Sequence, residues 1–294
     1  MSADASAAAH LDQGSILRAA SALGMVGTGG KSVTELVAVL CSETTSSETI
    51  LSLIEQQPLL AARILRVANS AYYGYTRAVT TLQRAMAVLG TQAVRGIAVT
   101  CSVDRVMSQR LEVVLPDAAQ YLRHSIATAI AAQALALDAR LSCHQEAYVG
   151  GMLHNIGVAI QACIDGTGVR KIATIRAFDT TTPIRELEAV QSRVAHEVCG
   201  GVALSAWRLP SRIVSAAAHH HGPADAPADD MPFVALVSVA ASLATACNCG
   251  FNLEEAGGEI HPELLRCAGL ETEHVDNVGA VLEGRVACLL DALN

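Results

Sequence analysis

The chain has 294 residues, of which 51% are hydrophobic and only 3% aromatic, and its formal net charge is −8. A large core built from small and aliphatic side chains is typical of closely packed helices. The negative charge and the lack of a Lys or Arg run argue against nucleic-acid binding through phosphate contacts, and leave room only for a local basic patch, for example Arg63, Arg66, Arg77 and Arg84.

The cysteines and the N-terminus predict a cytoplasmic protein. The nine cysteines are scattered, and the closest pair, Cys247 and Cys249, does not form a C-x-x-C motif. An odd, scattered set argues against a disulfide framework and fits a reducing compartment. The N-terminus also lacks the basic start and apolar run of a signal peptide.

Helical periodicity dominates the first 115 residues. A helix that begins near Pro58 is expected to bury one stripe of side chains, formed by Leu60, Ile64, Val67 and Ala71. Thr80 or Thr81 can cap a second helix, which Gly90 is expected to end. A third helix is expected to start at Thr91, with Val94, Ala98 and Cys101 turned inward.

The second half repeats this helical pattern. Asp117, after a corner at Pro116, can begin a helix that carries His124. Ser211 is expected to cap a later helix that ends at Gly222. Residues 231–253 carry no charge and are long enough to span a bilayer, but Pro232 and Asn248-Cys249-Gly250 bound the apolar part, so we expect a buried core helix and no membrane span. No alternating strand is evident, and the predicted fold class is all-α.

Histidines recur in or at the ends of these apolar helices. His124, His154 and His196 lie on separate helices, and His219-His220-His221 ends another. If the helices converge, the imidazoles could share one cavity that holds iron (Fe), manganese (Mn) or zinc (Zn). A hydrolytic metal site also needs carboxylates, but Asn155 follows His154 and the uncharged helix 233–247 contains no acid.

Simpler interpretations of these histidines stay open. A single histidine on an apolar helix face is usually a hydrogen-bonded core residue, and the run at 219–221 could merely bond the free carbonyls of a helix end. Three separate helices together with the run favour a shared pocket, whether or not it holds metal.

Ordered motifs along the chain resemble one family. The N-terminal half contains "IEQQPLLAARILRVANSAYYG" and "TTLQRAMAVLGTQAVRGIAV"; the second half contains "HSIATA", "YVGGMLHNIG", "VAHEVCGGVALSAWRLP" and "AAHHHGP". From about Glu35 to Ala246 the chain resembles HDOD domain proteins, bacterial relatives of the HD and HD-GYP phosphohydrolases. Gln57-Pro58 departs from the usual Asp-Pro, while Asn69-Ser70-Ala71 and Gly74 are kept.

The resemblance implies a fold and a set of site residues. It implies an N-terminal helical lobe (residues 1–115, HDOD-like from about 35) packed on an HD-phosphohydrolase-like helical bundle (116–294). Asn155 corresponds to a metal-bridging Asp, Ala241 to a later Asp ligand, and Gly222-Pro223-Ala224 replaces the Gly-Tyr-Pro motif. The implied vestigial or weak metal set is His124, His154, Asn155, His196, His220 and His221, and no catalytic residue is expected.

The function implied is bacterial signal transduction without catalysis, through protein partners whose identity the sequence does not give. Two alternatives remain: a metal-dependent phosphohydrolase of nucleotides or cyclic dinucleotides, and a nucleotide or metal sensor without turnover. Aromatic side chains beside an arginine suit a binding surface, although the tyrosines could merely cover a helix end. The candidate surface residues are Asn69, Ser70, Tyr72, Tyr73, Tyr75 and Arg77.

Overall fold

The computed structural model describes residues 13–24, 33–42, 44–115, 118–191, 194–254 and 260–293. Within these ranges the regular structure is helical and contains no strand, so the predicted all-α fold class is confirmed. The helices are α1 (Gln13–Gly24), α2 (Val33–Cys41), α3 (Ser47–Glu55), α4 (Pro58–Ala68), α5 (Leu82–Leu89), α6 (Thr91–Leu111), α7 (Ala118–Asp138), α8 (His144–Leu153), α9 (Ile156–Phe178), α10 (Ile184–Val190), α11 (His196–Ala206), α12 (Ser211–His219), the short 3-10 helix η1 (Pro223–Asp225), α13 (Met231–Ala246), α14 (Pro262–Ala268) and α15 (Thr272–Leu293).

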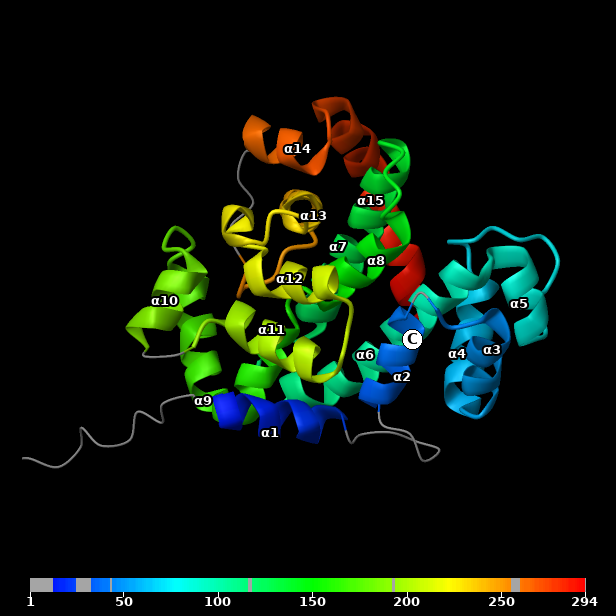
Figure 1. Cartoon of the computed structure of the whole chain (residues 1–294), viewed down its shortest axis with the longest axis horizontal. Helices are drawn as coiled ribbons and strands as arrows, with labels where there is room; N and C mark the ends of the chain where they lie inside the picture. The colour runs from blue at the N-terminus through cyan, green and yellow to red at the C-terminus, as the bar shows by residue number, and fades with distance from the viewer. Residues whose placement is uncertain are drawn as a thin grey trace, which may run out of the picture.

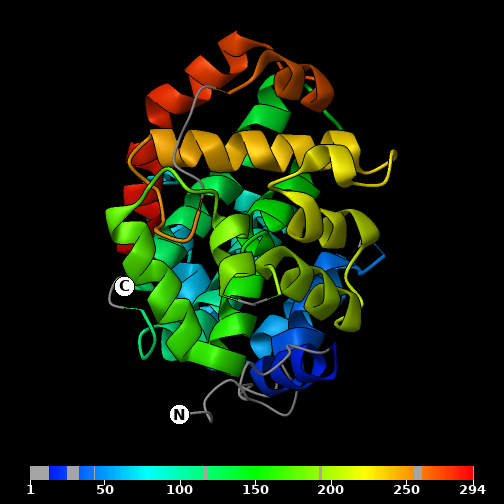
Figure 2. The ribbon, with the colours of Figure 1, turned by 90° about the vertical axis from the view of Figure 1, so that its left-hand side faces the viewer.

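The helices gather in two groups. Helices α2 to α5 lie together at one side of the molecule, and α7 to α13 form the larger body (Figure 1). Helix α6 packs against members of both groups, while α1 packs on α9 and α11 of the larger body. Helix α15 packs on α7 and also reaches α4, so the last helix ties the two groups together. In the view of Figure 2, α13 crosses the molecule beneath α14, which packs on it.

The first group follows its sequence signals closely, with one exception. Helix α4 has Pro58 in its first turn and ends at Ala68, so the prediction that Ala71 continues its buried stripe is wrong: that residue lies beyond the helix and is exposed. The chain turns away because the side chain of Asn69 accepts a bond from the N–H of Val79 (2.7 Å) and donates to its carbonyl (2.8 Å). These two bonds close the loop between residues 69 and 79.

Four further helix boundaries can be compared with the sequence signals. Thr81 caps α5 by accepting a bond from the Arg84 N–H, and Gly90 follows with a φ of +84°, as predicted. Helix α12 begins at Ser211 itself, with Pro210 in the cap position, and it ends at His219, so the predicted Ser211 cap and Gly222 end are wrong. The proline fixes φ at this position, and no side-chain cap bond forms at this helix start. Pro116 and Asp117 lie outside the described residues.

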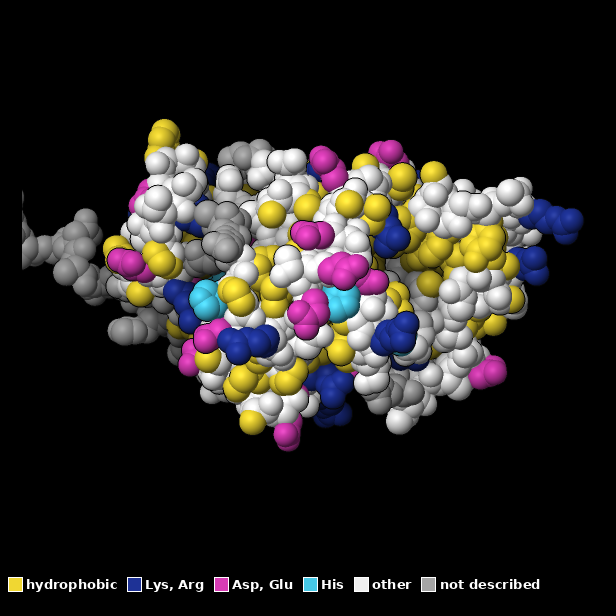
Figure 3. Space-filling view, turned by 90° about the horizontal axis from the view of Figure 1, so that it is seen from above, with side chains coloured by type: hydrophobic (Ala, Val, Ile, Leu, Met, Phe, Trp, Pro, Cys, Tyr) yellow, Lys and Arg dark blue, Asp and Glu magenta, His cyan; other side chains and the backbone are white. Residues whose placement is uncertain are grey.

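The most apolar stretches of the chain are buried. By length and composition the segment His144–Phe178 could cross a membrane, but 89% of its apolar window is buried inside the protein. The consecutive helical segments Leu82–Leu89 and Thr91–Asp104 are together also long and apolar enough to do so, but they are bent by 118°. Helix α13 is shorter and lies in the core, as expected from its bounding residues. On the face over α13 to α15, acidic, basic and apolar side chains are intermixed (Figure 3).

Two glycines allow unusually close helix packing around the α8–α9 break. A Cβ placed on Gly157 would lie 1.7 Å from the backbone oxygen of His196, and one on Gly151 would lie 2.7 Å from the backbone of α7. Real Cβ atoms do not approach backbone atoms so closely, so only glycine fits at these crossings. The first residue of α11, His196, is thereby held directly against the start of α9.

We predict that Gly157→Ala lowers the free energy of unfolding by about 3 kcal/mol or more, at the upper end of the cost of overpacking, because α11 must move away from α9. The control is Gly284→Ala on α15, where a Cβ meets nothing within 4 Å. An alanine there should stabilise the protein by up to about 1 kcal/mol through helix propensity. Chemical denaturation measures both changes, and equal stability of the two variants would contradict the close approach.

The Asn69 bonds give a second prediction. Asn69→Ala leaves the N–H and carbonyl of Val79, which is 3% exposed, without these side-chain partners. The expected loss is about 1–3 kcal/mol of unfolding free energy. Thr76→Ala in the same loop changes an exposed side chain and serves as the control. A denaturation midpoint for Asn69→Ala that matches this control would show that the loop does not depend on Asn69.

Candidate metal centre

Five histidines from four parts of the chain meet in the core of the larger body. His124 comes from the middle of α7, His154 from the break between α8 and α9, and His196 from the first residue of α11. His220 and His221 follow the end of α12. The neighbouring rings lie edge to face or tilted, with centroids 4.2–5.2 Å apart. His124, His154 and His196 are completely buried, so the convergence proposed from the sequence is present in the structure.

Helix ends place several of these rings. The last turn of a helix leaves carbonyls without intrahelical partners, and a ring Nδ1–H can satisfy one of them. His154 bonds in this way to the Gly151 carbonyl (2.7 Å) at the end of α8, and His220 to the Ala217 carbonyl (3.2 Å) at the end of α12. The break between α8 and α9 is therefore part of how the site is built.

The remaining rings are oriented by groups outside the cluster. His124 Nδ1 lies 2.9 Å from the Cys249 carbonyl, and His196 Nδ1 lies 3.0 Å from the carboxylate of Glu188 on α10. A carbonyl can only accept a hydrogen bond, so Nδ1 of His124 carries the proton and its Nε2 keeps a lone pair. The same holds for His154 and His220. Metal-binding histidines usually hold their second nitrogen in this manner.

Glu254 enters the centre of the cluster. Its Oε2 lies 3.6 Å from His124 Nε2 and 3.7 Å from His154 Nε2, and its Oε1 lies 3.5 Å from His221 Nε2. The side-chain amide of Asn155 donates a hydrogen bond to the same Oε2. The side chain of Glu254 is only 5% exposed. The expectation that the pocket lacks an acid is therefore wrong in one respect, because a carboxylate reaches it from another segment.

The sequence analysis missed Glu254 for a clear reason. The residue lies in the irregular segment after α13, beyond the region from Glu35 to Ala246 that carries the family motifs. Ala241, the position expected to correspond to an acidic ligand, is a buried alanine on α13. The one available signal was the first acid after a long uncharged stretch, and helical periodicity gives no means of placing such a residue.

Two further carboxylates support the cluster from outside. Glu188 also accepts bonds from the backbone N–H of His196 and from the Gln161 amide (2.8 Å). Glu197 forms a bidentate ion pair with Arg185 (2.5 and 2.9 Å) and accepts a hydrogen bond from the backbone N–H of His221 (3.1 Å). Both acids thus fix the positions of residues that carry imidazoles into the centre.

Electrostatics favour neutral donors beside one charged acid. Burial lowers the pKa of His154, and burial together with the neighbouring His221 holds the pKa of His220 well below its ordinary value. Burial would raise the pKa of Glu254, but the nearby imidazoles, His221 first, outweigh it and keep that pKa well below its usual range. Near neutral pH His154 and His220 therefore offer lone pairs beside the charged Glu254, which are the protonation states that a metal requires.

His196 differs from the other rings. Burial would lower its pKa, but the Glu188 carboxylate outweighs this and raises the pKa to about 9. Its Nε2 lies 3.3 Å from His220 Nε2, which must accept because the other nitrogen of His220 donates to a carbonyl. His196 therefore donates from both of its nitrogens in this arrangement.

The donor set fits a metal ion. The Nε2 atoms of His124 and His154 and the Oδ1 of Asn155 are buried without a hydrogen-bond partner. Two groups have ligand atoms within 4.8 Å of one another, His124-His154-Glu254 and His196-His220-His221. His196 has to release its Nε2 proton to join the second group, and the imidazoles with the Glu254 carboxylate then suit iron, manganese or zinc.

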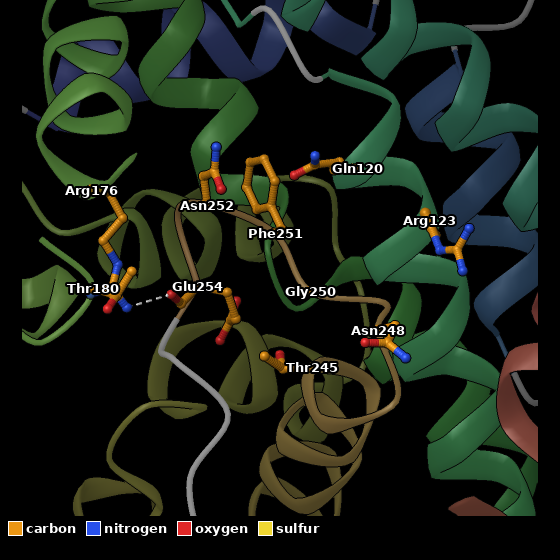
Figure 4. A pocket seen from close by; sticks show the side chains of 10 residues that line it. All are labelled: Gln120, Arg123, Arg176, Thr180, Thr245, Asn248, Gly250, Phe251, Asn252 and Glu254. Atoms are coloured by element: carbon orange, nitrogen blue, oxygen red, sulfur yellow. Dashed lines mark hydrogen bonds between the residues drawn. The ribbon is translucent and has the colours of Figure 1, made fainter. Parts of the chain in front are cut away.

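A separate cavity of about 500 Å³ is lined by the segment 248–254 together with residues of α7, α9 and α13 (Figure 4). Arg123 and Arg176 line it at opposite sides, and Phe251 and polar side chains line the rest. Glu254 belongs to its wall, but none of the five histidines lines it. The segment is anchored by the bond from Arg176 to the Glu254 carbonyl (2.9 Å) and by the edge contact of Phe251 with Tyr121. Through Glu254 this segment borders both the cavity and the histidines.

The candidate partner surface lies on the first helical group, away from the histidines. Asn69 and Ser70 bond backbone carbonyls, and Tyr72 and Tyr73 are half-buried and pack edge to face at 4.8 Å. Tyr75 is 45% exposed, with its hydroxyl bonded to the Val88 carbonyl. Of the candidate basic patch, Arg63 pairs with Asp104 at 2.7 Å, and Arg66, Arg77 and Arg84 are exposed.

Solved structures share the fold at low sequence identity. An HDOD domain protein of unknown function from Geobacter sulfurreducens has a TM-score of 0.76 and 19% identity, over 96% of this chain and 99% of that one. A protein from Shewanella amazonensis SB2B described as a "Putative phosphohydrolase" has a TM-score of 0.74 and 19% identity, over 95% and 98%. A "Putative signal transduction protein" from Marinobacter aquaeolei VT8 has a TM-score of 0.68 and 18% identity, over 89% and 57%.

Sequence comparisons identify the family. An uncharacterized protein of Treponema pallidum (strain Nichols) is 24% identical over 196 residues, which are 65% of this chain but only 36% of that protein. The match therefore spans little more than a third of the length of this relative. The HDOD domain model matches residues 28–223, about two thirds of the chain, and the protein thus belongs to the HDOD domain family.

Proposed function

We propose that this protein is a non-catalytic regulator that acts in cytoplasmic signal transduction through contacts with protein partners. The observation that supports this proposal is the closure of the histidine cluster. Its donor nitrogens are buried, and the Glu254 carboxylate already lies where three of them point. A phosphodiester would have to displace the segment 248–254 before it could reach them.

The chemistry of metal sites points the same way. When a divalent metal is bound, it can make a coordinated water nucleophilic, but hydrolysis needs a coordination position that is open to the substrate. Sites in which protein side chains fill every coordination position are typical of structural metals. In this chain His124, His154, Glu254 and the group His196-His220-His221 would hold the metal, while Glu188 and Glu197 keep the rings in place. This arrangement suits a rigid scaffold for regulation.

We predict negligible phosphodiesterase turnover. Protein purified without a His tag would be assayed with Mn²⁺, Fe²⁺ or Zn²⁺ on bis-p-nitrophenyl phosphate, nucleotides and cyclic dinucleotides. The expected rate equals that of His154→Ala, which removes a ring of the cluster. His219→Ala is the matched control, because His219 is next to the cluster in sequence but lines a different cavity. Metal-dependent turnover that is lost in His154→Ala and kept in His219→Ala would contradict the proposal.

The alternative activity is a metal-dependent phosphohydrolase of nucleotides or cyclic dinucleotides. The presence of Glu254 favours it, because a carboxylate helps to balance the charge of bound metals. Catalysis would require the segment 248–254 to move outward. The turnover assay above separates this alternative from the leading proposal.

A third candidate is a sensor without turnover, and the cavity of about 500 Å³ favours it. Its volume suits a small molecule, and the partly exposed Arg123 suits an anionic one, whereas the buried Arg176 already donates to main-chain carbonyls. A nucleotide that binds there should raise the unfolding free energy by about 2.7 kcal/mol at 100 times its Kd. Thermal shift with a nucleotide panel tests this. A shift that persists unchanged in Arg123→Ala would place the binding elsewhere.

The surface around Tyr75 and Arg77 is our proposal for the partner contact. Both side chains are exposed, whereas Tyr72 and Tyr73 pack on the core and their loss would disturb the fold. We predict that Arg77→Glu weakens binding of a partner, found by crosslinking and then purified, by about tenfold or more, as for a typical hot spot. Arg18→Glu on α1 makes the same charge change on an exposed arginine elsewhere. Equal affinities for the two variants would refute this surface.

A further inference from the structure

We propose that Glu254 supplies the carboxylate that Asn155 lacks, so that the acid of the metal centre has moved from the α8–α9 break to the segment after α13. The inference rests on the cluster being a metal centre, which the proposed function treats as closed and non-catalytic. The ligand would be a divalent transition metal such as Mn²⁺, Fe²⁺ or Zn²⁺.

The contact between Asn155 and Glu254 shows why the two residues belong together. The Asn155 amide donates to Glu254 Oε2, and both side chains are buried. An Asp at position 155 would put a second carboxylate within hydrogen-bond distance of the first, and two such acids cannot both remain ionised without a cation between them. An amide at 155 therefore allows a carboxylate to enter from position 254. The two residues are a matched pair.

The position of Glu254 is that of a bridging group. Its Oε2 faces His124 and His154, while its Oε1 faces His221, which belongs to the second group of three. One carboxylate thus reaches both groups of candidate ligands. Glu188 does not compete for this role, because it bonds Nδ1 of His196, the ring nitrogen that faces away from His220.

Charge makes Glu254 decisive for metal affinity. Imidazoles contribute lone pairs but no negative charge, and a divalent cation in a buried site is costly without nearby anions. Replacing the carboxylate by an amide of nearly the same size removes the charge and leaves the shape. We therefore expect a large loss of affinity from Glu254→Gln with little change in packing.

The experiment measures metal binding rather than activity. Metal content by mass spectrometry and Zn²⁺ and Mn²⁺ affinities by chelator competition would be compared in four proteins: wild type, Glu254→Gln, the double variant Glu254→Gln/Asn155→Asp, and Glu263→Gln. Glu263 is an exposed acid whose side chain is 75% accessible, so its variant makes the same chemical change away from the cluster. We expect Glu254→Gln to bind metal at least about 100-fold more weakly than wild type, because loss of a group that only supports a ligand already costs about 10–100-fold. Glu263→Gln should match wild type, and the double variant should recover most of the lost affinity.

The visible absorption of bound Co²⁺ gives a second readout, since it responds to the exchange of a carboxylate for an amide. If Glu254→Gln does not fold, Glu254→Asp replaces it: the charge is kept but retracted by one methylene, and we expect an intermediate affinity. Wild-type affinity in folded Glu254→Gln, or no recovery in a folded double variant, overturns the inference. If wild-type protein binds no metal, the inference about Glu254 is also overturned, but the proposed regulatory function is unaffected. If wild-type protein shows turnover, the non-catalytic function is refuted, but the role of Glu254 as a ligand is unaffected.

Discussion

A charged carboxylate buried among imidazoles is the constraint on which the core of this protein depends. An isolated buried charge is costly, so the imidazoles around Glu254 have to be held in fixed orientations. Main-chain carbonyls hold three of these rings through their Nδ1 atoms. Carbonyls at the ends of α8 and α12 orient His154 and His220, and the Cys249 carbonyl orients His124. Helix ends therefore build much of the cluster: His154, His196, His220 and His221 lie at or beside helix breaks and termini, and only His124 lies inside a helix.

Small residues make that arrangement possible. Gly157 lets α11 start against α9, and the same contact sets the position of His196 and, through Glu188, of α10. The site thus depends on a residue that has no side chain as much as on those that supply donors. The first helical group lies apart from this construction and is joined to it through α6 and α15.

Local signals predicted the fold well. The starts of α4 and α5, the turn at Gly90 and the meeting of the histidines all follow from spacing and from Pro, Thr and Gly chemistry. Glu254 could not be found in this way, since an irregular segment returns to the core through contacts that no periodic pattern encodes. The prediction that Ala71 continues the buried stripe of α4 was wrong because Asn69 bonds Val79, ten residues further along the chain, and the helix ends before Ala71. Of the three consecutive histidines 219–221, only His220 and His221 enter the cluster, because α12 ends at His219.

The long apolar stretch from His144 to Phe178 has a consequence for how the chain folds. Before folding it would resemble a membrane span and expose a surface that invites aggregation. Helix α8, its first part, makes its most extensive contact with α7, the helix immediately before it in the chain. Contacts between sequence neighbours close small loops and form quickly. The α7–α8 hairpin can therefore cover the first part of this stretch as soon as it leaves the ribosome, whereas α9 packs mainly on α11 and must wait until that helix has been synthesised.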